Sequence, residues 1–320
     1  MRSESIDLAK ALLVIAMILV HAIQFCGERH PVMDAVYKLG DLTIYSGFLI
    51  CFGYACQRAY LSRPTVPWGR VAATVGRLYL AYAISAAAFR VVIAHDLNPA
   101  TYRDLLLLRI IPNYAEFFLG FALSVGLAAA SAPILRPLLD RTWALPLMAL
   151  PVLAIGLIPA QPVDPLIGLW VGGSNFAYFP VLTYFPLFLL GAWLARHDLR
   201  IGRVGVLVAS PLVVFGVALA LDAWTTSRFP PSPWWVVTSA GLAVWAIAAG
   251  ELLDRWRIPV FTAWLAEIGH RILFYVLVSN ILLMCCNALQ IFQLLAPFQV
   301  LVLGLATVAL CSVLSGFARR

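Results

Sequence analysis

Apolar residues form long, nearly continuous stretches along this chain, and short polar loops separate them. Ten of these stretches reach or approach the ~20 residues that an α-helix needs to cross a bilayer. They cover residues 8–26, 42–61, 71–94, 105–130, 143–160, 178–196, 204–223, 234–253, 260–289 and 295–318. The fifth is short and interrupted by proline, and the ninth is long enough to begin in the interface. The pattern predicts an all-α, polytopic transmembrane bundle of about ten spans.

Composition favours one membrane domain. Hydrophobic residues make up 62% of the chain and charged residues 12%, with a mean hydropathy of +0.92. Such values are typical of a polytopic membrane protein and not of a globular one. The ten stretches use most of the 320 residues and leave no room for a soluble domain. We therefore expect residues 1–320 to form a single integral membrane domain.

Basic residues gather on alternate loops. If the N-terminus is cytoplasmic, 14 of the 22 Lys and Arg residues fall in cytoplasmic segments and five fall on the opposite face. This is the positive-inside pattern, so we predict that both termini are cytoplasmic, in a bacterial cytoplasmic (inner) membrane. The pattern, together with contact to anionic lipid, also accounts for the net charge of +7 without a nucleic-acid partner.

Several kinds of chemistry lack their usual sequence motifs. The six cysteines include no C-x-x-C pair and no Cys/His spacing typical of zinc, so no metal site is expected. The chain also has no Walker loop, no G-x-G-x-x-G, no H-E-x-x-H and no G-x-S-x-G. The sequence therefore argues against ATP-driven transport and against the chemistry of soluble hydrolases.

The first apolar stretch carries ionisable residues at a helical spacing. Lys10 and His21 are eleven positions apart, which places them within about 20° of one stripe and roughly 16 Å apart along an α-helix. Asp7 lies one turn before Lys10 and can pair with it. An ammonium or imidazole group in hydrocarbon costs at least ~2.5–3.5 kcal/mol, so these residues are candidates for function by default.

The same stretch, SIDLAKALLVIAMILVHAIQF, resembles the first transmembrane helix of the acyltransferase-3 membrane proteins. Their hallmark is an I-D or L-D pair followed by a basic residue, ten positions and a histidine, and the related heparan-α-glucosaminide N-acetyltransferase-like proteins share it. IYSGFLICFGY is similar to the family's second-helix element, and RVAATVGRLYLAY to its arginine-rich entry into the third helix. Later elements of the N-acetyltransferase-like branch resemble FPVLTYFPLFLLGAWLAR, SRFPPSPWWVVTSAG and EIGHRILFYVLVSN, so the likeness covers nearly the whole chain.

The resemblance implies that an acyl group, usually acetyl, moves from cytoplasmic acyl-CoA to a hydroxyl or amine. Acetyl-CoA or another acyl-CoA would be the co-substrate, and the acceptor would be a glycan, a lipid-linked sugar or a small molecule. His21 would act as general base or as a transient acyl carrier, since imidazole titrates near neutrality. Lys10, set by Asp7, would orient the helix of His21 or support the donor. The CoA phosphates would be held by three arginines: Arg70, Arg77 and Arg271.

Two features depart from the family pattern. The family commonly has arginine where this chain has Lys10, and lysine keeps the charge but lacks the planar fork that grips a phosphate with two bonds. Many relatives end the LFFYLLH-type helix with histidine, where this chain has Ser279 and Asn280. A second histidine role is therefore not expected at that position.

Structural interpretations stay open beside the functional ones. Lys10 can snorkel to the interface, and Arg70 and Arg77 can be ordinary positive-inside anchors. Three polar residues within spans are candidates for substrate binding: Ser46, Glu116 and Asn280. Ser46 can equally serve close helix packing. Glu116 can face a cavity or pair with Arg109, and Asn280 can line a tunnel or bridge helices.

Other functions also remain open. A secondary transporter or flippase for a glycan or lipid is the main alternative, and its expected sign, an inverted repeat with paired broken helices, is not visible by inspection. A non-catalytic membrane partner is a third. The sequence decides neither between O- and N-transfer nor whether the protein is a homodimer.

Overall fold

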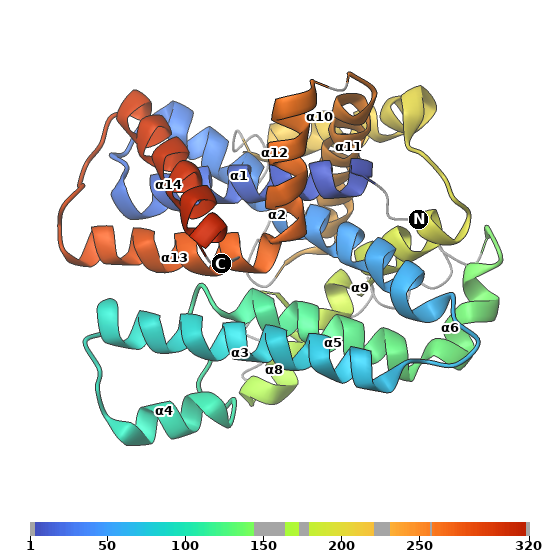
Figure 1. Ribbon diagram of the computed structural model, residues 1–320, viewed down its shortest axis with the longest axis horizontal. Helices are drawn as coiled ribbons and strands as arrows, with labels where there is room; N and C mark the ends of the chain where they lie inside the picture. The colour runs from blue at the N-terminus through green and yellow to red at the C-terminus, as the bar shows by residue number, and fades with distance from the viewer. Residues whose placement is uncertain (1–3, 144–163, 173–178, 221–230, 257, 318–320) are drawn as a thin grey trace.

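The computed structural model describes residues 4–143, 164–172, 179–220, 231–256 and 258–317. All the regular elements in these ranges are helices (Figure 1). They are α1 (Glu4–Cys26), α2 (Pro31–Cys56), the π-helical turn η1 (Gln57–Leu61), α3 (Trp68–Val92), α4 (Pro99–Leu106), α5 (Glu116–Ala130), α6 (Ala132–Leu139), α8 (Pro165–Val171), α9 (Val181–Arg196), α10 (Gly202–Ala220), α11 (Pro233–Trp256), α12 (Pro259–His270), α13 (Ile272–Ala288) and α14 (Pro297–Phe317).

The described helices form a membrane-type bundle. Five are long and apolar enough to cross a bilayer: α1, α2 continued by η1, α3, α11 and α14. The bent pairs α5–α6 and α12–α13 raise this to seven if each pair is one span, and α9 and α10 are shorter apolar helices. The all-α membrane class is thereby confirmed, with five to seven candidate spans in the described residues. The total of ten stays a prediction, and the span at 143–160 lies outside the described residues except for Trp143.

The span predicted at 105–130 is wrong as a single helix. The chain instead forms α4, a non-helical segment at 107–115, and then α5. Pro112 within the segment cannot donate a helical hydrogen bond. Leu108 and Tyr114 have positive φ angles of 57° and 66°, which a right-handed helix does not contain.

The span predicted at 260–289 is also broken, because α12 and α13 meet at 81°. Polar groups at the bend contact neighbouring helices: His270 Nε2 lies 2.9 Å from Asp7 Oδ2 in α1, and Arg271 donates to the Ser315 carbonyl in α14 at 2.7 Å. Polar and charged groups of this kind would be costly in hydrocarbon if they were not paired. The bend brings His270 and Arg271 to their partners. As a result, α12 crosses α1 and α13 steeply (Figure 1).

Helix α1 lies at the centre of the bundle, in contact with α2, α11, α12, α13 and α14. Glycines allow two of these neighbours to approach its backbone. A Cβ at Gly250 of α11 would lie 2.6 Å from the Ser5 carbonyl oxygen, and a Cβ at Gly269 of α12 only 1.9 Å from the Asp7 carbonyl oxygen. Small residues at helix contacts are a common device of membrane proteins. Because these glycines let α11 and α12 come close to α1, the polar groups near its start are enclosed by other helices.

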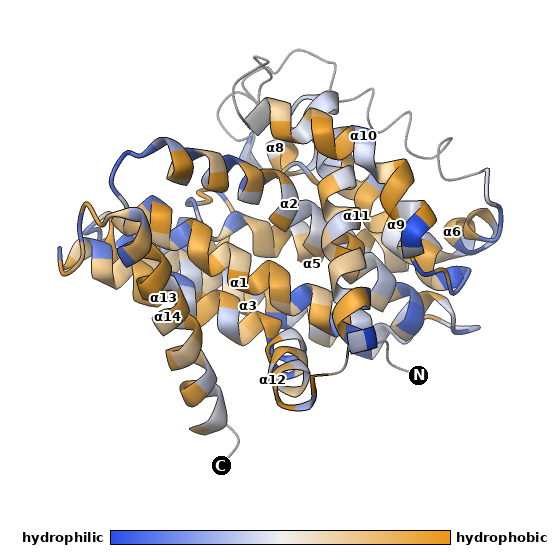
Figure 2. Cartoon of the chain, turned by 90° about the horizontal axis from the view of Figure 1, so that it is seen from above, coloured by the Kyte–Doolittle hydropathy of each residue, from blue (hydrophilic) through white to orange (hydrophobic). Residues whose placement is uncertain are grey.

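Hydrophobic residues make up most of the helices, while hydrophilic ones gather mainly at helix ends and loops (Figure 2). Val204 and Val208 of α10, for example, are about three-quarters exposed, at 74% and 72%. Large apolar side chains that face outward at this density suit contact with lipid rather than with water. The protein is therefore an integral membrane protein.

Candidate functional site

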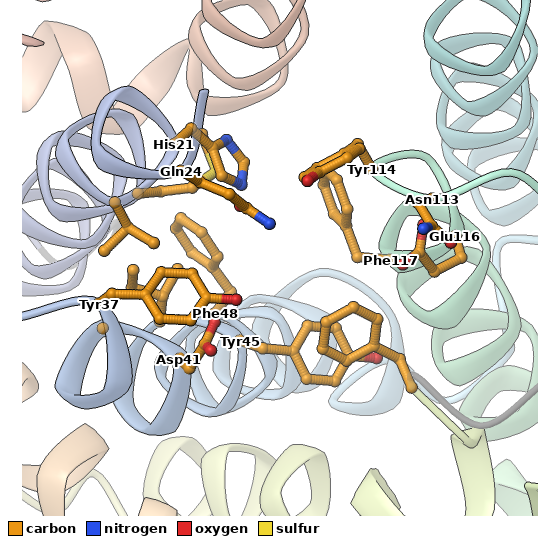
Figure 3. Close-up of a pocket in the computed structure, with 15 residues that line it drawn as sticks. His21, Gln24, Tyr37, Asp41, Tyr45, Phe48, Asn113, Tyr114, Glu116 and Phe117 are labelled. Carbon is orange, nitrogen blue, oxygen red and sulfur yellow. The ribbon is translucent and has the colours of Figure 1, made fainter. Parts of the chain in front are cut away.

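A cavity of about 150 Å³ lies between α1, α2, the 107–115 segment and the start of α5. Its described lining carries eight polar side chains among aromatic and aliphatic ones (Figure 3). These are His21, Gln24, Tyr37, Asp41, Tyr45, Asn113, Tyr114 and Glu116. A small concave site with a few convergent polar groups is the usual form of a ligand pocket, and we refer to it as the His21 pocket.

Helical spacing explains how α1 and α2 line this pocket. His21 and Gln24 are three positions apart on α1, while Tyr37, Asp41 and Tyr45 are four apart on α2. Residues at these spacings share one helix face. Two polar stripes on neighbouring helices therefore face each other across the cavity.

His21 is half-buried at the pocket wall. Its ring packs edge-on against Tyr114, with centroids 5.9 Å apart, and against Phe25 at 6.2 Å. Aromatic contacts on two sides limit the orientations that the imidazole can adopt. The imidazole of His21 is thus held at the wall of a small cavity that carries several other polar side chains.

Glu116 begins α5 and is 5% exposed. Its Oε2 accepts a hydrogen bond from the Ala115 backbone N–H at 2.9 Å, and a carboxylate is favoured at a helix N-terminus. The sequence left open whether Glu116 faces a cavity or pairs with Arg109. Glu116 lines the His21 pocket, and Arg109 lies 3.6 Å from Asp104.

Tyr45 is also buried in the lining, with 6% of its surface exposed. Its ring packs against Phe179 and Tyr184, with centroids 4.1 and 4.9 Å away. Its hydroxyl is buried without a hydrogen-bond partner in the described part of the chain. It sits against α5, where Gly120 leaves room for it.

Asp7 and Lys10 form the predicted i,i+3 pair, with Nζ and Oδ1 2.9 Å apart. His270 of α12 adds a second contact to the same carboxylate at 2.9 Å, which the sequence gave no means of predicting. This cluster does not line the His21 pocket. It lies near the opposite end of α1, where even Lys10, the nearer of the two α1 residues, is roughly 16 Å from His21 along the helix at 1.5 Å per residue. The three residues grouped from the sequence thus belong to two separate places.

None of the three predicted CoA-binding arginines lines the His21 pocket. Arg70 and Arg77 are exposed on the first turns of α3, and Arg77 Nε donates to the Ala73 carbonyl at 3.1 Å. Arg271 contacts Glu267 at 2.6 Å and Ser315 at 2.7 Å. Arg271 therefore ties the α12–α13 bend to α14.

Ser46 and Asn280, both predicted as substrate contacts, lie between helices. The Ser46 hydroxyl donates to the Ser239 hydroxyl of α11 at 2.7 Å, with both residues buried. Asn280 Nδ2 donates to the Tyr114 carbonyl at 3.3 Å. Neither lines the His21 pocket, although Asn280 contacts a residue that does.

Sequence reasoning missed the polar stripe of α2. The reason is that the predicted span began at residue 42, whereas α2 begins at Pro31. A signal for the earlier start was present, because His30 caps the helix through Nδ1 and proline occupies the first turn. With that start, Asp41 would have stood out as an acid inside a span.

The chain matches no protein-family model, and no curated protein matches it. Its function therefore has to be argued from the chemistry of the pocket. The pocket offers a titratable imidazole, two carboxylates, amides and phenols around a space large enough for a small polar group. That set is suited to proton transfer with a bound hydroxyl or amine.

Proposed function

We propose that this protein is a membrane-embedded acyltransferase of a bacterial cytoplasmic membrane. It moves an acyl group, acetyl in the first instance, from cytoplasmic acyl-CoA to a hydroxyl or amine of a glycan, lipid-linked sugar or small-molecule acceptor. One observation supports the proposal most: the membrane-embedded imidazole of His21 faces a small polar cavity inside the helix bundle. The sequence likeness supplies the reaction class.

In this proposal His21 acts as general base. It accepts the proton of the acceptor O–H or N–H as the oxygen or nitrogen attacks the thioester carbonyl. The C–S bond then breaks, and the proton passes to the thiolate of the departing CoA. If transfer proceeds in two steps, His21 itself carries the acyl group and hands it to the acceptor.

The size of the pocket limits which parts of acyl-CoA and of the acceptor can bind in it. A space of about 150 Å³ admits an acyl group and the reacting end of an acceptor, but not the nucleotide of CoA. The CoA phosphates would then bind where α3 begins, beyond the far end of α2, where Arg70 and Arg77 are exposed. The thioester would have to reach His21 through the bundle.

The test is thermal unfolding of the detergent-purified protein with and without acetyl-CoA, combined with an assay for released CoA thiol. A ligand at ~100 times its dissociation constant stabilises by about 2.7 kcal/mol, which shifts the midpoint visibly. His21→Ala should keep this shift and lose transfer by about 10²–10⁴-fold. His95→Asn, outside the bundle, is the control. If no acyl-CoA stabilises folded wild-type protein, the proposal is wrong.

A transporter or flippase is the second candidate, because two helix pairs, α5–α6 and α12–α13, are bent by 83° and 81°. Paired broken helices are common at the substrate sites of secondary transporters. This function predicts solute movement in proteoliposomes that depends on a gradient and not on CoA.

A further inference from the structure

Tyr114 has an unusual backbone and two unusual partners. Its φ of 66° lies in the left-handed region, which few aromatic residues occupy. Its carbonyl accepts a hydrogen bond from Ser85 Oγ of α3 at 3.1 Å and one from Asn280 Nδ2 of α13 at 3.3 Å. Side chains from two helices outside the pocket lining thus hold one backbone group of a pocket residue.

Asn280 is an unfavourable residue for a position that serves helix packing alone. It is fully buried, and its Oδ1 has no hydrogen-bond partner within the described ranges. Burying an amide with an unsatisfied oxygen costs stability that an apolar side chain of similar size would not. Its hydrogen bond to the Tyr114 carbonyl is the favourable interaction that its amide makes at this position.

The ring of Tyr114 connects this arrangement to His21. The two rings meet edge to face at 88°, with centroids 5.9 Å apart, along one wall of the pocket (Figure 3). Phe25 and Phe89 pack against the same tyrosine, at 4.8 and 6.1 Å. The tyrosine is therefore fixed at its backbone by hydrogen bonds and at its ring by packing, and it covers one side of the imidazole.

We propose that Tyr114 is the positioning residue for His21, and that Asn280 and Ser85 act on His21 only through it. By holding the tyrosine ring against the imidazole, they keep His21 in one orientation and partly shield it. The catalytic meaning of this arrangement rests on the proposed function, whereas the coupling between the residues does not. Asn280 would then have a role in the reaction without touching substrate.

The test measures the reactivity of His21 directly, as its rate of carbethoxylation by diethyl pyrocarbonate followed by mass spectrometry. Asn280→Leu removes the hydrogen bond, and Tyr114→Gly removes the ring while permitting the left-handed backbone. Both should speed modification of His21 by about tenfold; for Asn280→Leu this corresponds to the loss of roughly one hydrogen bond. His197, whose Nε2 lies 2.9 Å from the Leu139 carbonyl, is the internal reference and should not change.

A matched variant serves as the control. Ser279→Ala removes a buried hydroxyl beside Asn280 that donates to the Val276 carbonyl of its own helix at 3.3 Å. It should not change the modification rate. If Asn280→Leu does not fold, Ser85→Ala removes the other bond to the Tyr114 carbonyl and decides the question by the same measurement.

The proposal is overturned if folded Tyr114→Gly and Asn280→Leu proteins leave the rate at His21 unchanged. Where wild-type protein transfers acyl groups, Asn280→Leu should lower kcat by about tenfold and leave KM unchanged, since the residue does not contact substrate. Wild-type protein that transfers nothing would instead contradict the proposed function, and the modification rates would still decide the coupling.

Discussion

At the scale of single residues, Gly120 decides how closely Tyr45 can pack against α5. A Cβ at this position would lie 2.4 Å from the tyrosine hydroxyl oxygen, but 3.5 Å from the next ring atom. We expect Gly120→Ala to destabilise the protein by roughly 1–3 kcal/mol through overpacking, and added Tyr45→Phe to restore most of the loss. The measurement is the thermal unfolding midpoint in detergent.

Gly126 in the same helix provides the control, because a Cβ there meets nothing within 4 Å. Gly126→Ala should be neutral, or stabilising by up to ~1 kcal/mol through helix propensity. Equal midpoints for the Gly120→Ala and Gly126→Ala proteins would contradict the packing argument.

Asp7 is a buried carboxylate whose partners affect stability. It is 2% exposed and contacts both Lys10 and His270. Asp7→Asn should destabilise the protein by about 3 kcal/mol, the lower end for a broken buried pair, because the lysine is itself 14% exposed. Lys10→Met added to it should recover part of the loss. Asp198→Asn, which breaks the exposed pair with Arg58, should cost at most ~1 kcal/mol. Similar losses of unfolding free energy for Asp7→Asn and Asp198→Asn would show that burial does not strengthen the Asp7–Lys10 pair.

At the scale of elements, contacts between helices set where the pocket-lining stripes lie. A Cβ at Gly53 of α2 would lie 1.8 Å from the Phe188 carbonyl oxygen of α9, and one at Gly191 of α9 would lie 1.9 Å from the Ile50 carbonyl oxygen. Because backbone cannot move aside as a side chain can, either substitution to alanine should force the helices apart.

We therefore expect Gly53→Ala and Gly191→Ala to reduce the yield of monodisperse protein and to lower its unfolding midpoint. Gly76→Ala in α3 is the control, since its Cβ would meet nothing within 4 Å. The measurement is size-exclusion chromatography in detergent, followed by thermal unfolding. Normal behaviour of both α2–α9 variants would refute the close approach.

At the scale of the whole molecule, the distribution of basic loops predicts its orientation. A cysteine placed at Asn98 should react with a membrane-impermeant maleimide on intact cells, and one placed at Ser62 only after permeabilisation. Unmodified protein is the control for the six native thiols, all of which lie on helices. The reverse pattern of labelling would place the N-terminus outside.

The sequence predicts the class of the molecule well and its breaks poorly. Apolar length and charge bias are summed over many residues, so they identify an all-helical membrane protein reliably. The interruption at 107–115 and the bend at His270 depend on a few polar contacts between distant segments, such as Asp7 with His270. A stretch read by hydropathy alone contains no information on those partners.

Some contacts of the candidate site could likewise be predicted from the sequence, and others could not. Residue spacing along a single helix determined the pairing of Asp7 with Lys10 and marked His21 for attention, because neighbours on one helix depend on local geometry alone. Only the tertiary structure placed Glu116 at the pocket, Ser46 against Ser239, and Asn280 on the Tyr114 carbonyl. Each of those contacts joins residues on different elements, and the packing of the whole bundle decides which helix faces meet.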